Sequence, residues 1–124
     1  MTRSLAVLMD PIEAIHPAKD TTLALLLEAQ RRGYALLYAT QDALAIRDGV
    51  AWGRLAALEV RDDAHDWFSL APAQWRPLAG IEVFLARKDP PVDAQFLYDT
   101  MVLELAQAAG VQVVNDPRGL RDAN

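Results

Sequence analysis

The chain has 124 residues, 52% hydrophobic and 23% charged, which is ordinary for one globular domain that buries about two-thirds of its unfolded surface. A net charge of −5 argues against a nucleic-acid or anionic-membrane surface, and the lack of cysteine excludes disulfides and thiolate metal sites. No apolar run approaches the roughly 20 residues of a membrane span, and the N-terminus lacks the pattern of a signal peptide, so we expect a soluble cytoplasmic domain.

The first part of the chain predicts a strand, a helix and a second strand. The first strand covers Leu5 to Asp10, and the helix runs from Thr21 to Arg32 with Asp20 as its N-cap. Gly33 supplies the left-handed residue that ends a helix, and the second strand, Tyr34 to Tyr38, follows at once. So short a link after a right-handed crossover makes the two strands parallel. The helix face that we expect to pack on the sheet carries Leu23, Leu26 and Leu27.

The middle of the chain, residues 42–78, predicts an antiparallel insertion on the sheet edge. Apolar residues alternate on both sides of Asp48-Gly49, which is a strong two-residue hairpin pattern, and a further strand is expected from Leu55 to Arg61. Asp62 and Asp63 open a loop-rich stretch, whose acidic residues indicate a charged surface. The tryptophans of this region, which we expect to pack under the insertion, are Trp52, Trp67 and Trp75.

Parallel order resumes with a strand from Ile81 to Arg87, a helix from Ala94 to Ala109 capped by Asp93, and a strand from Val111 to Val114. The predicted fold class is therefore α/β, with a mainly parallel sheet flanked by helices and an antiparallel hairpin insertion. The last residues begin a helical turn and stop, which favours a domain cut from a longer chain. The apolar stripe of the second helix is Leu97, Met101, Leu105 and Ala108.

Three of the predicted strands end near an Asp-Pro step. Open α/β sheets bind ligands just outside the carboxyl ends of their strands, so these polar segments predict one ligand edge. The segments are Asp10-Pro11, Arg87-Lys88-Asp89-Pro90-Pro91 and Asn115-Asp116-Pro117.

Arg87-Lys88-Asp89-Pro90-Pro91 is the strongest candidate for chemistry. The paired prolines hold the backbone extended, so three charged side chains are expected on a stiff turn. The Arg87 guanidinium is suited to bind a carboxylate through two hydrogen bonds, and Asp89 to orient it or to meet an ammonium group. An exposed salt-bridge cluster is the alternative. Asp10 is compatible with a metal ligand, a phosphoryl acceptor or, most commonly, a turn cap.

The remaining patterns exclude several kinds of site. His16 and His65 lie in polar loops with no second His or Cys at ligand spacing. No Gly-x-Gly-x-x-Gly follows the first strand, and no Walker-type loop, nucleophile elbow or His-Glu-x-x-His occurs. The chain therefore lacks a nucleotide-binding motif, and we expect it to supply only half of a ligand-binding site.

Four stretches resemble the start of bacterial glutathione synthetase. They extend from the first strand to the last residue, in the same order and at compatible spacing. They are Val7-Leu8-Met9-Asp10-Pro11-Ile12, Leu25 to Tyr34, Arg87 to Pro91, and Val114-Asn115 together with Leu120 to Asn124. Thr21-Thr22 stands where relatives often carry serines, and the segment from Asp42 to Trp75 matches only loosely.

The resemblance implies a Rossmann-like, pre-ATP-grasp domain, residues 1–124, of a longer chain whose ATP-grasp domain is absent here. Enzymes of this family join γ-glutamylcysteine to glycine with ATP and magnesium through an acyl phosphate, and they assemble as homo-oligomers. The resemblance places Arg87 against γ-glutamylcysteine, and we expect Lys88, Asp89 and Asp10 beside it. It implies no catalytic residue, metal or cofactor within these residues, so the chain alone is expected to be inactive.

A free-standing α/β regulatory or ligand-binding module without catalysis is the alternative. A response-regulator receiver has the same length and alternation, but it needs an acidic pair after the first strand and a late strand-end lysine. This chain offers a lone Asp10 and no lysine after Lys88. The residues therefore favour the ligase domain.

Overall fold

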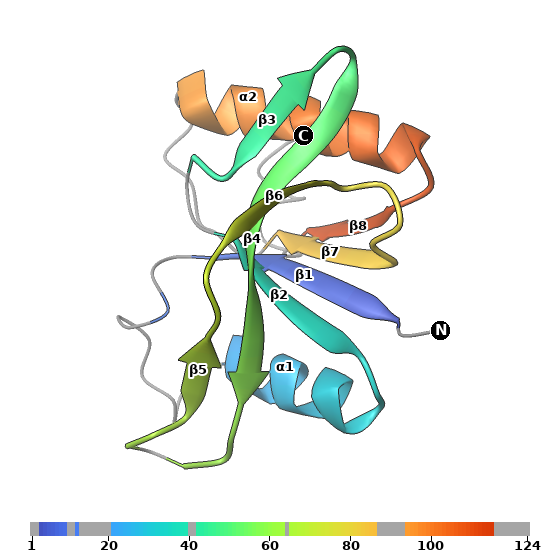
Figure 1. Ribbon diagram of the computed structural model, residues 1–124. Coiled ribbons are helices and arrows are strands. Elements are labelled where there is room, and N and C mark those ends of the chain that lie inside the picture. Colours follow the sequence, from blue (N-terminus) through green and yellow to red (C-terminus); the bar gives the residue numbers. More distant parts are fainter. Residues whose placement is uncertain are drawn as a thin grey trace.

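The computed structural model describes residues 3–9, 12, 21–39, 42–63, 65–86 and 94–115. Its described strands form one mixed sheet with the path β3-β4-β2-β1-β7-β8, and β5 and β6 both pair with β4 (Figure 1). This arrangement confirms the predicted α/β fold class. The elements are β1 (Ser4–Leu8), α1 (Thr21–Arg31), β2 (Ala35–Ala39), β3 (Leu44–Arg47), β4 (Val50–Val60), β5 (Phe68–Leu70), β6 (Gln74–Pro77), β7 (Val83–Ala86), α2 (Ala94–Ala108) and β8 (Gln112–Asn115).

The parallel part of the sheet consists of β2, β1, β7 and β8, which pair in that order. The two helices lie on opposite faces of this part (Figure 1). Side chains of a strand alternate between the faces, so β1 contributes to two separate cores. Leu5 and Val7 pack in the core with α1, while Ala6 and Leu8 pack in the core with α2.

The first helix follows its prediction closely. Leu23 and Leu26 are buried against the sheet, and Leu27 is half-buried. Gly33 has a φ of +93°, the left-handed conformation expected of a residue that ends a helix. β2 then pairs in parallel with β1, as predicted.

The insertion is confirmed as an antiparallel unit at the edge of the parallel strands, where β4 pairs with β2. Asp48 and Gly49 connect β3 to β4 and both have positive φ, 53° and 74°, as a tight two-residue hairpin turn requires. The predicted boundaries inside the insertion are wrong, because the second hairpin strand and the strand expected from Leu55 to Arg61 are one 11-residue strand, β4. β4 stays continuous because β3 pairs with its first half and β2 with its second. The predicted loop-rich stretch contains β5 and β6, which pair with the other edge of β4.

Two of the three tryptophans lie where they were expected. Trp67 is buried in the α1-side core and meets the ring of Phe68 at 4.8 Å, and Trp52 is half-buried. Trp75 was expected to be packed, but its exposed fraction is 39%. The Arg47 guanidinium lies 4.9 Å from the centre of its ring.

The second helix mainly buries a different face from the predicted stripe, of which Leu105 alone is partly buried against the core. Leu97 and Met101 are exposed, with exposed fractions of 57% and 56%. The face that packs on the sheet is made by Asp99, Val102, Leu103 and Ala106, at spacings of three and four residues. Neither described helix is long and apolar enough to cross a membrane.

Candidate functional site at the carboxyl-end edge of the sheet

The four parallel strands end at one level. Leu8 of β1 is the register partner of Ala39 in β2 and of Ala86 in β7, and Ala86 is the partner of Asn115 in β8. The last residues of four neighbouring strands therefore form a row along one edge. This is the edge at which open α/β sheets bind ligands.

The residues predicted to bind substrate, Asp10, Arg87, Lys88 and Asp89, lie outside the described residues. What the structure does give is the position from which each segment starts. Arg87 directly follows Ala86, and Asp10 comes two residues after Leu8, the register partner of Ala86. The two segments therefore leave the sheet from adjacent strands at the same edge, and the roles of their side chains remain predictions.

Two backbone amides, one on each side of Asp10 in the chain, donate hydrogen bonds to residues of β2. The amide of Met9 donates to the carbonyl of Ala39 at 3.4 Å, and the amide of Ile12 donates to the Tyr38 hydroxyl at 3.0 Å. Met9, Ile12 and Tyr38 are all buried. β2 therefore anchors the segment that follows β1 before and after the candidate carboxylate.

The sequence-based reasoning missed the role of Tyr38. A tyrosine in an otherwise apolar, buried strand needs a hydrogen-bond partner for its hydroxyl group, and that requirement was the available indication. Its partner could not be identified, because Ile12 is distant in the chain and lies beyond the end of the predicted strand.

The acidic loop after β4 is accounted for by local contacts. The Asp63 carboxylate accepts from the amides of His65 and Asp66 at 2.9 and 3.2 Å, and these bonds lower the pKa of Asp63. Asp66 pairs with Arg61 at 3.0 Å. In the part of the chain that the structure describes, no group of three or more His, Asp or Glu side chains could hold a metal ion. The interpretation of this loop as a charged surface fits these contacts.

None of the described glycines lies in a phosphate-binding loop of the Walker or dinucleotide-binding kind. A phosphate cradle needs glycine backbone at the end of a parallel strand and before a helix. The described glycines with positive φ serve other ends of the fold. Gly33 and Gly110 follow the two helices, Gly49 turns the hairpin, and Gly80 precedes β7.

A mixed sheet contains four neighbouring parallel strands with a helix on each face, and polar segments follow their common row of strand ends. This arrangement defines a Rossmann-like α/β domain. The family model for the N-terminal domain of prokaryotic glutathione synthetase matches residues 4–121. The chain belongs to this family.

Individual relatives agree with the family match. The chain is 52% identical over all its 124 residues to the glutathione synthetase of Xanthomonas axonopodis pv. citri, and 49% identical to that of Xylella fastidiosa strain Temecula1. It is 48% identical to the glutathione synthetase of Pseudomonas aeruginosa. The chain spans 39–40% of the length of these relatives. The resemblance drawn from the sequence is confirmed, and the receiver alternative finds no support.

Proposed function

We propose that this chain is the substrate-binding N-terminal domain of a glutathione synthetase, an ATP-dependent ligase that joins γ-glutamylcysteine to glycine through an acyl phosphate. The observation that carries the proposal is the family match over residues 4–121, together with relatives that are named glutathione synthetase. ATP and Mg²⁺ would be held by parts of the protein that correspond to the remaining length of these relatives. Residues 1–124 would bind neither.

The part of this domain would be to bind and orient γ-glutamylcysteine, which carries carboxylates and an ammonium group. Arg87 would bind a carboxylate, because a guanidinium can donate two parallel hydrogen bonds to its two oxygens. Lys88 would add positive charge, and Asp89 or Asp10 would meet the ammonium group. The shared row of strand ends supports this assignment, because it starts both segments from neighbouring strands.

The wider setting of the proposal is a cytoplasmic enzyme that works as a homo-oligomer, with γ-glutamylcysteine and glycine as its small-molecule partners and with neither nucleic acid nor membrane. The isolated residues 1–124 would not form glutathione.

The test is a ligase assay on the full-length protein with ATP, Mg²⁺, γ-glutamylcysteine and glycine, in which glutathione and ADP are both quantified. We expect equal amounts of the two products, and no glutathione when any one component is omitted. A parallel assay of residues 1–124 is expected to give none. ADP release without glutathione, or product formation with another acceptor but not with glycine, would contradict the proposal.

A further inference from the structure

One face of the β3–β4 hairpin is left open by the described elements. α2 packs against the other face of β3 and β4, where Ala51 and Leu55 are buried. Side chains alternate along a strand, so Val50, Trp52 and Arg54 lie on the open face. α1 packs on this side of β4 only against its second half (Figure 1). No described helix therefore covers the first half of β4 on this face.

β3 and β6 add side chains to the open face, because directly opposed residues of an antiparallel pair point to the same side. The Arg47 guanidinium of β3 lies 4.9 Å from the ring centre of Trp75 and 5.7 Å from that of Trp52, so these three side chains meet. We call this surface the insertion face. It consists of three register pairs, which are Arg47 with Val50, Trp52 with Pro77, and Arg54 with Trp75.

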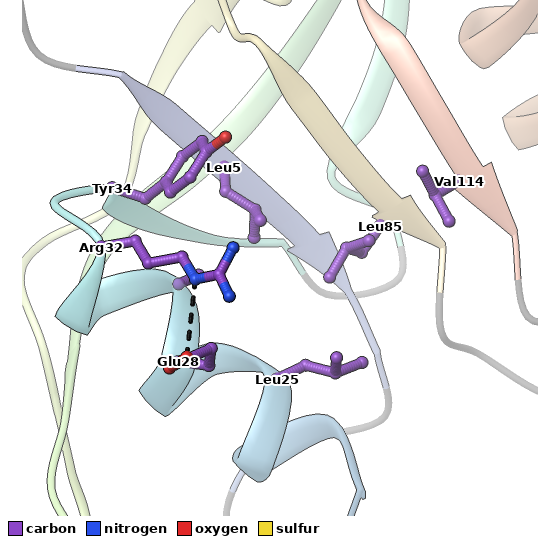
Figure 2. Close-up of a pocket in the computed structure, with 8 residues that line it drawn as sticks. Leu5, Leu25, Glu28, Arg32, Tyr34, Leu85 and Val114 are labelled. Carbon is purple, nitrogen blue, oxygen red and sulfur yellow. Dashed lines mark ion pairs between the residues drawn. The ribbon is translucent and has the colours of Figure 1, made fainter.

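The insertion face is exposed and carries unpaired positive charge. The exposed fraction of Val50 is 43%, and both arginines of the face are exposed. Arg47 and Arg54 have no ion pair with any described residue, whereas Arg32, for example, lies 3.5 Å from Glu28 (Figure 2). Tryptophan and arginine are enriched at protein–protein interfaces and provide much of their binding energy. The insertion face therefore has the composition of an interface.

The order of charges along this hairpin is self-complementary. Asp48, at the hairpin turn, is exposed and has no ion pair within the described part of the chain. Two copies of β4 that run antiparallel across a two-fold axis at Ala51 bring together residues that lie equally far from Ala51 on either side. Asp48 of one copy then meets Arg54 of the other, and Val50 meets Trp52. Opposite charges therefore pair at both ends of a contact whose centre is apolar.

We propose that the insertion face binds the insertion face of a second copy of this chain, with Asp48 of each copy paired with Arg54 of the other. The inference rests on the homo-oligomer of the proposed function and assigns a contact surface to it. A second copy suits the face because it supplies the carboxylates that the unpaired arginines lack. Nucleic acid and anionic membrane suit it less, because the chain as a whole has a net charge of −5.

The test is the mass of the full-length protein in solution, measured by sedimentation equilibrium over a range of concentrations. Arg54→Glu places a like charge opposite Asp48 at both ends of the contact and should raise the Kd of one association step at least about tenfold. Asp48→Lys should do the same, and the double variant should restore most of the association because the pair forms again with its signs exchanged. The matched control is Arg76→Glu, which opposes Gly53, points away from the insertion face and should leave the Kd unchanged.

Trp75→Thr serves if a charge variant fails to fold, and it should also weaken association because it removes an exposed ring from the contact. An oligomer whose Kd is unchanged in Arg54→Glu or in Trp75→Thr would overturn the proposed contact. Weakening by both single charge variants without recovery in the double variant would overturn the pairing of Asp48 with Arg54. A parent protein that is monomeric at every concentration would overturn the contact together with the homo-oligomer. The ligase assay of the proposed function is read separately from all of these results.

Discussion

Tyr38 is the residue that connects the sheet to the chain around Asp10. Its hydroxyl group accepts a hydrogen bond from the amide of Ile12, at 3.0 Å in a buried position. Tyr38→Phe removes the acceptor and leaves this amide without the partner it has in the structure. We expect a loss of about 1–3 kcal/mol in the free energy of unfolding, measured by urea denaturation.

Tyr98→Phe is the matched control for this change. The Tyr98 hydroxyl accepts a hydrogen bond from the amide of Ile46 at 2.9 Å. This bond is exposed, so water can replace the hydroxyl as the acceptor. The loss should therefore be at most about 1 kcal/mol. Equal losses for the two variants would show that burial of the Ile12 amide does not increase the contribution of its hydrogen bond to the free energy of unfolding.

Glu28 gives the fold a defined pH dependence. Its carboxylate accepts two hydrogen bonds from Arg31, at 2.6 and 2.8 Å, and these bonds lower the pKa of Glu28 from 4.5 to about 2. A lowered carboxyl pKa stabilises the folded protein above the unfolded-state value, and the effect disappears as the pH falls through the folded-state value.

Glu28→Gln should therefore lower the melting temperature at pH 7, and the difference from the parent should shrink between pH 4.5 and about 2. Because the pair is exposed, the effect is small and is best followed in a series of thermal melts. Repeating the change in an Arg31→Gln background should reduce it. A difference that grows toward low pH would contradict the assignment.

At the scale of the elements, the α2 face shows where sequence pattern and structure diverge. Apolar residues surround much of this helix, so the sequence was compatible with burial of either of two faces. One contains Leu97 and Met101, and the other contains Val102, Leu103 and Ala106. The buried face includes Asp99, a polar residue that weakened its apolar pattern. Packing against the sheet determines which face is buried, because α2 contacts strands from distant parts of the chain.

Two leucine truncations on α2 test this correction. Leu103→Ala removes a side chain with an exposed fraction of 8%, and we expect a loss of about 2–5 kcal/mol in the free energy of unfolding. Leu97→Ala makes the same chemical change at a position that is 57% exposed, and should alter it by no more than about 0.5 kcal/mol. A larger loss for Leu97→Ala than for Leu103→Ala in denaturant unfolding would show that the predicted stripe is the buried face.

Local chemistry explains which elements were predictable. Asp48-Gly49 requires two residues of positive φ, and Gly33 ends α1, so the hairpin and the helix end follow from residue type. The joining of two predicted strands into β4 depends on pairing with β2, β3, β5 and β6. Such pairing between distant segments has no local pattern.

At the scale of the whole molecule, the common edge was predictable because parallel strands place their carboxyl ends together. Leu8, Ala86 and Asn115 confirm that geometry. The binding residues were selected by charge type and by family resemblance, and they lie beyond the described strand ends.

The most direct test of the proposed function is the KM of the full-length enzyme for γ-glutamylcysteine after Arg87→Ala. Loss of a charged hydrogen-bonding group predicts a rise of about 10- to 100-fold, with the KM for ATP unchanged. Arg76→Ala, an exposed position on β6, is the matched control and should leave both values unchanged. If Arg87→Ala behaves like Arg76→Ala, the carboxyl-end edge does not bind the substrate through Arg87, and the central claim fails.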